Sequence, residues 1–183
     1  MSRPAPETGE RVEIRRLDGI EARAHLEELA AVLVDCVEGG ASVGYLAPFS
    51  HEEARRVYEE YLVDVARGRR VLLAAFSEGA LVGTAQLVLP PHANQPHRAE
   101  VARVLVHRSA RRRGIASGLM EELESEARAE GRTLLVLDAV TGGDAERLYE
   151  RLGWVKVGVI PNYALYPDGS PCDTTYFWKA LPG

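Results

Sequence analysis

The apolar positions of this chain follow two patterns, one with a helical period and one made of short uninterrupted runs. Apolar residues that recur every three or four positions predict helices, and short β-branched runs predict strands. Helices are predicted near residues 18–37, 50–65, 114–127 and 144–152. Strands are predicted near residues 12–15, 71–76, 81–89, 99–106, 133–139, 154–160 and 174–180. Two of the helix starts carry a capping-box pattern, Asp18 with Glu21 and Ser50 with Glu53.

The order of these elements predicts an α/β fold built on a mixed sheet. Strands 71–76 and 81–89 form a hairpin, because only a short glycine-containing turn joins them. Strand, helix and strand between residues 99 and 139 predict a right-handed parallel crossover, which makes those two strands neighbours. Residues 38–49, 90–97 and 161–173 are rich in turn formers and are predicted as loops. Residues 1–10 are predicted as a disordered lead-in, and residues 11–183 as a single domain.

Composition and charge exclude several classes of protein. A net charge of −5 gives no support to nucleic-acid binding, which normally shows as a basic domain. The two cysteines, Cys36 and Cys172, lie far apart and outside any metal-ligand spacing, so neither a disulfide framework nor a metal site is predicted. No apolar run approaches the roughly 18 residues of a membrane span, and the N-terminus lacks the apolar core of a signal peptide. We therefore expect a cytoplasmic protein without membrane or nucleic-acid partners.

The junction between strand 99–106 and the following helix is a candidate anion site. It reads Arg111-Arg112-Arg113-Gly114-Ile115-Ala116. The first N–H groups of a helix lack intrahelical partners and carry the positive end of the helix dipole, so a phosphate is favoured there. Neither of the best-known phosphate motifs, GxxxxGK[ST] and GxGxxG, is present. The same run is also compatible with a solvated basic turn.

Arg111, Gly114 and Ala116 match the pattern R/Q-x-x-G-x-G/A after an apolar strand. This pattern resembles motif A of the GCN5-related N-acetyltransferases (GNAT), which transfer an acetyl group from acetyl-CoA to an amine. The phrase from Tyr149 to Trp154 resembles the motif B of the same family. The resemblance implies the acyl-CoA N-acyltransferase fold, with about seven strands, largely antiparallel, splayed at the motif A strand and flanked by about four helices. It implies cofactor contacts at Leu105, Val106, Arg111, Arg112, Arg113, Gly114, Ile115, Ala116 and Ser117.

Three residues are candidates for the chemistry. The motif B resemblance places Tyr149 where its hydroxyl would protonate the departing CoA sulfur, although a tyrosine that packs the short helix onto the sheet fits the same pattern. Asp138 and Glu100 are the candidate bases, since an acid attracts an ammonium group and accepts its proton. Asp138 is also compatible with a turn-forming role, and Glu100 with a surface charge. The family resemblance also implies that the Val106 N–H is the donor to the oxyanion.

The acceptor is expected to be the primary amine of a small molecule. The phrases around residues 99–116 and 134–142 look most like the tabtoxin-resistance acetyltransferases, which acetylate an amino-acid-like toxin. One departure is Gly142, where many family members carry asparagine. A peptide or protein N-terminal acetyltransferase and a non-catalytic CoA-binding domain are the alternatives. The aromatic run Tyr176-Phe177-Trp178 would suit either a homodimer contact or the core.

Overall fold

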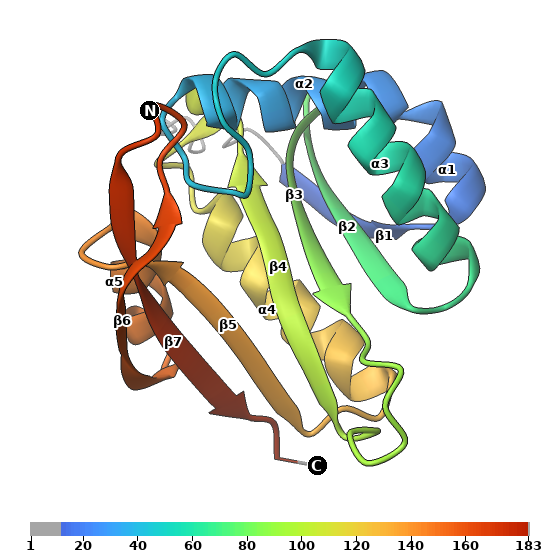
Figure 1. The fold of residues 1–183 in the computed structure, drawn as a ribbon. Helices are drawn as coiled ribbons and strands as arrows, with labels where there is room; N and C mark the ends of the chain where they lie inside the picture. Colours follow the sequence, from blue (N-terminus) through green and yellow to red (C-terminus); the bar gives the residue numbers. More distant parts are fainter. Residues whose placement is uncertain (1–11, 183) are drawn as a thin grey trace, which may run out of the picture.

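The computed structural model describes residues 12–182, which contain seven strands in one mixed sheet (Figure 1). The strands are β1 (Val12–Leu17), β2 (Arg70–Ser77), β3 (Ala80–Val88), β4 (Arg98–Val106), β5 (Leu134–Val140), β6 (Val155–Leu165) and β7 (Pro171–Ala180). The helices are α1 (Gly19–Ala24), α2 (Leu26–Glu38), α3 (His51–Ala66), α4 (Ile115–Ala129) and α5 (Asp144–Arg151), with a 3-10 turn at Arg108–Ala110. This architecture confirms the predicted fold class. The predicted lead-in, residues 1–10, lies outside the described residues.

The sheet is antiparallel except where β4 meets β5. Its strand order is β1-β2-β3-β4-β5-β7-β6, and the parallel β4–β5 pair confirms the predicted neighbours. This pairing covers only Arg98–Glu100 on β4 and Leu134–Val136 on β5. Beyond these residues the two strands diverge, as Figure 1 shows. The sheet is therefore splayed at the strand for which the family resemblance implied it.

Both predicted capping boxes are present, but the first predicted helix is broken. The Asp18 side chain accepts hydrogen bonds at the start of α1, and Ser50 does so at the start of α3. The predicted helix 18–37 divides at His25, which ends α1 and precedes α2. The His25 ring hydrogen-bonds Glu28 at 2.7 Å and packs edge-on against Phe76 on β2. These side-chain contacts hold His25 in a non-helical conformation within an otherwise helical pattern.

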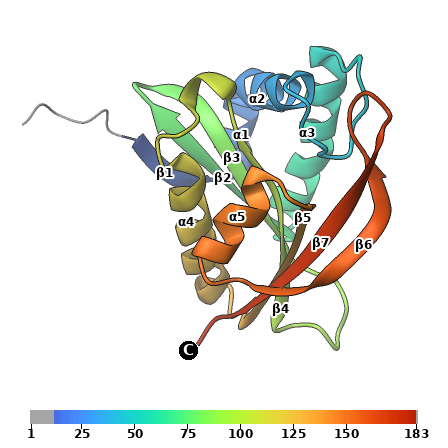
Figure 2. The same cartoon turned by 90° about the vertical axis from the view of Figure 1, so that its left-hand side faces the viewer.

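Two core clusters lie on opposite faces of the sheet. Alternate residues of β2 divide between them, with Leu73 in the cluster under α4 and α5 and Leu72 in the cluster under α1, α2 and α3. Figure 2 shows the same division, with α4 and α5 on one side of the sheet and α2 and α3 on the other. None of the helices within residues 12–182 is long and apolar enough to cross a membrane.

The predicted loop at residues 161–173 was too long, because only residues 166–170 lie outside the strands. β6 continues to Leu165 and β7 begins at Pro171, so only a tight turn separates them. An irregularity between Ile160 and Ala164 lets the strands keep pairing through turn-forming residues, and Asp168 closes the turn by accepting from the N–H and hydroxyl of Ser170. The turn contacts residues 39–50, the connection between α2 and α3, where the Ala47 N–H donates to the Pro167 carbonyl at 2.8 Å.

Candidate active site

The N-terminus of α4 is open, as an anion cradle requires. Its N-cap is Gly114, in the left-handed region at φ 78°, and no side chain of the described residues caps the helix. The first turn contains no acidic residue, whereas α1 and α3 have both a capping side chain and acids there. A Cβ built on Gly114 would meet nothing within 4 Å. The amides of Ile115, Ala116 and Ser117 are therefore available to an anion, and the first turn fits a pyrophosphate.

The three arginines before the cradle lie in different directions. The Nε of Arg111 donates to the Val106 carbonyl at 3.2 Å, which folds this side chain back onto β4. A guanidinium nitrogen of Arg113 donates to the Ser77 hydroxyl at the end of β2, at 2.9 Å. Arg112 is exposed and has a left-handed backbone at φ 62°. Part of the predicted positive charge is thus engaged with the protein.

The backbone N–H and C=O of Val106 point to the edge of β4 that faces the splay. The His107 N–H donates to the Val82 carbonyl on β3 at 2.9 Å. Because backbone groups alternate sides along a strand, those of Val106 point away from β3 and those of Leu105 point toward it. A Cβ on Gly83 of β3 would indeed lie 3.0 Å from the Leu105 carbonyl oxygen. Of the two residues predicted to meet the pantetheine arm, Val106 turns its backbone to the open edge.

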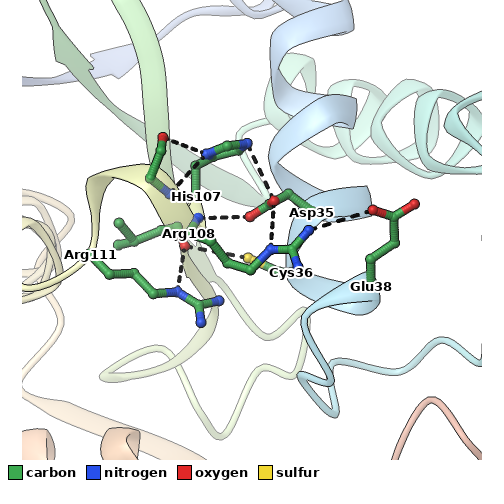
Figure 3. A network of polar contacts seen from close by, with 8 residues as sticks. Asp35, Cys36, Glu38, His107, Arg108 and Arg111 are labelled. Carbon is green, nitrogen blue, oxygen red and sulfur yellow. Dashed lines mark hydrogen bonds and ion pairs between the residues drawn. The ribbon is translucent and has the colours of Figure 1, made fainter.

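A polar network ties the turn after β4 to the end of α2 (Figure 3). The Asp35 carboxylate accepts from the backbone N–H of Arg108 at 2.7 Å and from its Nε at 2.8 Å. The His107 ring lies 3.4 Å from the same carboxylate, and Arg108 also approaches Glu38 at 3.6 Å. Burial alone would raise the pKa of Asp35, but the hydrogen bonds from Arg108 and the nearby positive charges hold that pKa below its usual value. The sequence gives no signal for this contact between residues 73 positions apart.

Tyr149 lies on α5 in the core cluster between α5 and the sheet. The residue is 6% exposed, and its ring centroid lies 6.0 Å from those of both Trp154 and Phe177. Burial, followed by the negative charge of Asp138, raises the pKa of Tyr149. No other described residue hydrogen-bonds its hydroxyl. The tyrosine therefore packs the short helix and also keeps its hydroxyl protonated.

The two candidate bases share the opposite face of the sheet. Their strand neighbours Leu137 and Ala99 point into the core cluster under α4 and α5, so Asp138 and Glu100 point away from it. Glu100 is the last β4 residue paired with β5, and Asp138 lies two residues beyond the last paired residue of β5. Asp138 reaches the surface, but the surrounding protein partly desolvates its carboxyl and raises the pKa, and the charge of Arg103 opposes this rise only in part.

Two tyrosines that the sequence interpretation missed lie beside these acids. Tyr176 on β7 is directly opposite Asp138 in the sheet register, and its hydroxyl donates to that of Tyr163 on β6 at 2.6 Å. This hydrogen bond and burial raise the pKa of Tyr176, and the charges of Asp138 and Glu100 raise it further. The alternation of β7 places Tyr176 on this face, but the sequence could not reveal which strand would lie beside β5.

Comparison with known proteins identifies the family of this chain. The acetyltransferase (GNAT) family profile matches residues 22–154. The chain belongs to the GNAT family of acetyltransferases. It is 33% identical over 129 residues to an N-acetyltransferase from the hisH-hisA intergenic region of Azospirillum brasilense, a match that covers 69% of this chain and 74% of that protein.

Solved structures share the fold of this GNAT acetyltransferase over nearly its whole length. A ribosomal-protein-alanine N-acetyltransferase from Brucella melitensis is 26% identical, with a TM-score of 0.78, and the match covers 92% of this chain and 99% of that one. The protein yncA of Salmonella typhimurium, solved with acetyl-CoA, is 19% identical, with a TM-score of 0.74 over 94% of this chain and 95% of that one.

Proposed function

We propose that this GNAT acetyltransferase transfers the acetyl group of acetyl-CoA to the primary amine of a small molecule, by direct attack in a ternary complex. One observation carries this proposal. The uncapped N-terminus of α4 and the open edge of β4 adjoin the splay, and a buried tyrosine and an accessible carboxylate lie on its two sides. The proposed acceptor resembles an amino-acid-like toxin, as in the tabtoxin-resistance group.

The residues of the cradle and of β4 would hold the cofactor. The amides of Ile115, Ala116 and Ser117 donate to the pyrophosphate, and Arg112 adds positive charge next to them. The backbone of Val106 faces the pantetheine arm, and its N–H is the proposed donor to the thioester carbonyl oxygen. Bound acetyl-CoA supplies the activated acetyl group.

The side chains of the splay would move the two protons of the reaction. Asp138 attracts the acceptor ammonium and takes its proton, directly or through water, so that the neutral amine can attack the thioester carbonyl carbon. Tyr149, whose raised pKa keeps its hydroxyl protonated, donates a hydrogen bond to the departing sulfur, and the thiolate takes its proton through this contact while the tyrosine regains one from water. Glu100, at the last paired position of β4, is the second candidate for the base.

A peptide N-terminus is the competing acceptor. The similar structure from Brucella melitensis, a ribosomal-protein-alanine N-acetyltransferase, favours it. The contacts of residues 39–50 support a small molecule instead. The Ser42 hydroxyl donates to the Leu165 carbonyl at 2.7 Å, and Ala47 donates to Pro167 in the β6–β7 turn. These hydrogen bonds join the loop to the hairpin, and such a closed arrangement disfavours the open groove that a peptide acceptor needs.

The test is release of free CoA from acetyl-CoA by the purified protein with a panel of small amines and short peptides. Turnover of a small amine, with a peptide competing poorly, is the expected result. Preferred turnover of peptides would replace the proposal with the N-terminal acetyltransferase. Tight binding of acetyl-CoA without turnover of any amine or peptide would instead indicate a non-catalytic CoA-binding domain, the reading that Gly142 in place of asparagine favours.

A further inference from the structure

Arg103 on β4 is a cation that aromatic residues from α3 and the α2–α3 connection hold in place. It has a left-handed backbone at φ 52°, close to the irregularity in the β3–β4 pairing. Its Nε donates to the Tyr61 hydroxyl at 3.3 Å, and its guanidinium carbon lies 5.5 Å from the centre of the Tyr45 ring. The Tyr45 and Tyr61 hydroxyls are 3.1 Å apart. Residues from β4, α3 and the α2–α3 connection therefore hold this guanidinium in place.

The charge of Arg103 is not balanced by a carboxylate. Within residues 12–182 it forms no ion pair, although its side chain is part-buried. A second cation, Arg70, stacks on the Tyr61 ring with its guanidinium carbon 4.2 Å from the ring centre. The one carboxylate paired with Arg70 is Asp64, at 3.8 Å. Within the described residues the tyrosines solvate this part-buried cation but no carboxylate neutralises it, so an anionic ligand would bind there favourably.

The positive charge of Arg103 lowers the pKa of Asp138 on β5, against the effect of burial. Yet the two groups do not form an ion pair. A cation and an anion that interact without forming an ion pair suit a ligand that carries both charges. Such a ligand places its ammonium at the carboxylate and its acidic group at the guanidinium.

We propose that Arg103, with Tyr45 and Tyr61, binds an acidic group of the acceptor, so that the acceptor is an amine with a carboxylate close to the amino group. This inference rests on the proposed function. Arginine suits the role because its planar array of N–H donors matches a carboxylate. The tyrosine hydroxyls fix the guanidinium and leave other donors of the same group for the ligand.

A small cavity adjoins these residues. Gly44 and Tyr45 line a space of about 230 Å³, together with Ser42, Leu46, Ala164 and Leu165. A Cβ on Gly44 would lie 3.0 Å from a guanidinium nitrogen of Arg103. The cavity is thus next to the guanidinium, between the α2–α3 connection and β6, and its volume suits a side chain of an amino-acid-sized molecule.

The experiment compares α-amino acids with their carboxamides, which keep the amine and lose the negative charge. The readout is the ratio of kcat/KM for acid over amide, because this ratio cancels any general loss of activity. The wild-type ratio should be about 10 to 100, and Arg103→Gln should bring it close to one. Arg56→Gln is the charge-matched control, since Arg56 lies exposed on α3. That variant should keep the wild-type ratio.

A wild-type ratio near one, or an unchanged ratio in Arg103→Gln, would overturn the inference. If Arg103→Gln does not fold, Arg103→Lys keeps the charge and should give an intermediate ratio, whereas a full wild-type ratio would count against the arginine.

If no amine is turned over, the proposed function fails and the subsite is tested by itself. Calorimetric titration of the same acids and amides into the CoA-bound protein should then show acid preference only when Arg103 is present, and equal binding would reject the subsite.

Discussion

Asp35 on α2 accepts both the backbone N–H and the Nε of Arg108, at 2.7 and 2.8 Å. This pair joins two segments with different functions in the proposed enzyme. Arg108 begins the turn that leads to the cofactor cradle, and Asp35 precedes the connection that covers the acceptor side (Figure 3). The carboxylate thus fixes the position of the cradle loop relative to the acceptor loop.

Asp35→Asn should destabilise the protein by about 1–3 kcal/mol at neutral pH, because the side chain is 11% exposed and its hydrogen bonds are charge-assisted. The pKa of Asp35 is lowered in the folded state, so its contribution is complete above its unfolded value near 3.8. The contribution is lost as the pH falls through the lower folded value. Denaturant unfolding from pH 7 to pH 3 should show the difference between wild type and variant shrinking below about pH 4.

Glu38→Gln is the matched control for this prediction. Glu38 approaches the same guanidinium at 3.6 Å, but its side chain is 62% exposed. An exposed ion pair contributes little, so the variant should differ from wild type by less than about 0.5 kcal/mol. Equal losses for the two variants would show that net charge on α2, and not the Asp35 contact, sets the stability.

Gly114→Ala should weaken acetyl-CoA binding by about tenfold or more. The left-handed backbone costs a non-glycine residue roughly 1 kcal/mol, and the added methyl would occupy the space next to the first amides of α4. Gly131→Ala provides the comparison at the other end of α4, because Gly131 also has a left-handed backbone and nothing within 4 Å of its Cβ position. Calorimetry should show equal thermal destabilisation of the two variants and a loss of affinity for Gly114→Ala alone.

The elements of the fold could be predicted because their signals are local. The Ser50 capping box and the apolar spacing of α3 act within one helix, and the hairpin turn at Glu78–Gly79 acts within four residues. The break at His25 could not be predicted, since it depends on the ring contact with Phe76, a residue 51 positions away in the sequence. The long β6–β7 hairpin was missed for a similar reason, because strand pairing overrode the turn propensity of residues 161–165.

The candidate site divides in the same way. The cradle follows from a strand, a glycine and a helix in sequence, so Gly114 and the α4 amides could be identified directly. The faces of Asp138 and Glu100 follow from alternation within their strands. Arg103, Tyr61 and Tyr176 could not be assigned to this face, because their neighbours come from distant segments brought together by the sheet order.

Asp138→Asn tests the proposed base through its pH dependence. The raised pKa of Asp138 places its ionisation above 3.8, so kcat/KM should fall as the pH drops through that raised value. The asparagine cannot accept the proton, so the variant should lose about 100-fold or more in kcat. The fall of kcat/KM at low pH, which is the acidic limb of the profile, should disappear as well. Rates should be measured from pH 4 to pH 7 beside Glu100→Gln. Loss of the limb in Glu100→Gln, with Asp138→Asn unaffected, would transfer the role of base to Glu100.

Tyr149→Phe separates the two roles of this tyrosine. The ring packs between Trp154 and Phe177, and phenylalanine preserves that packing, while no described residue loses a hydrogen bond with the hydroxyl. Stability and acetyl-CoA affinity should therefore change little. The proposed proton donor is removed, so kcat should fall by about 100-fold or more with acetyl-CoA as donor. Tyr58→Phe, a buried tyrosine in the other core cluster, should keep the wild-type kcat. An unchanged kcat in Tyr149→Phe would assign Tyr149 to packing alone.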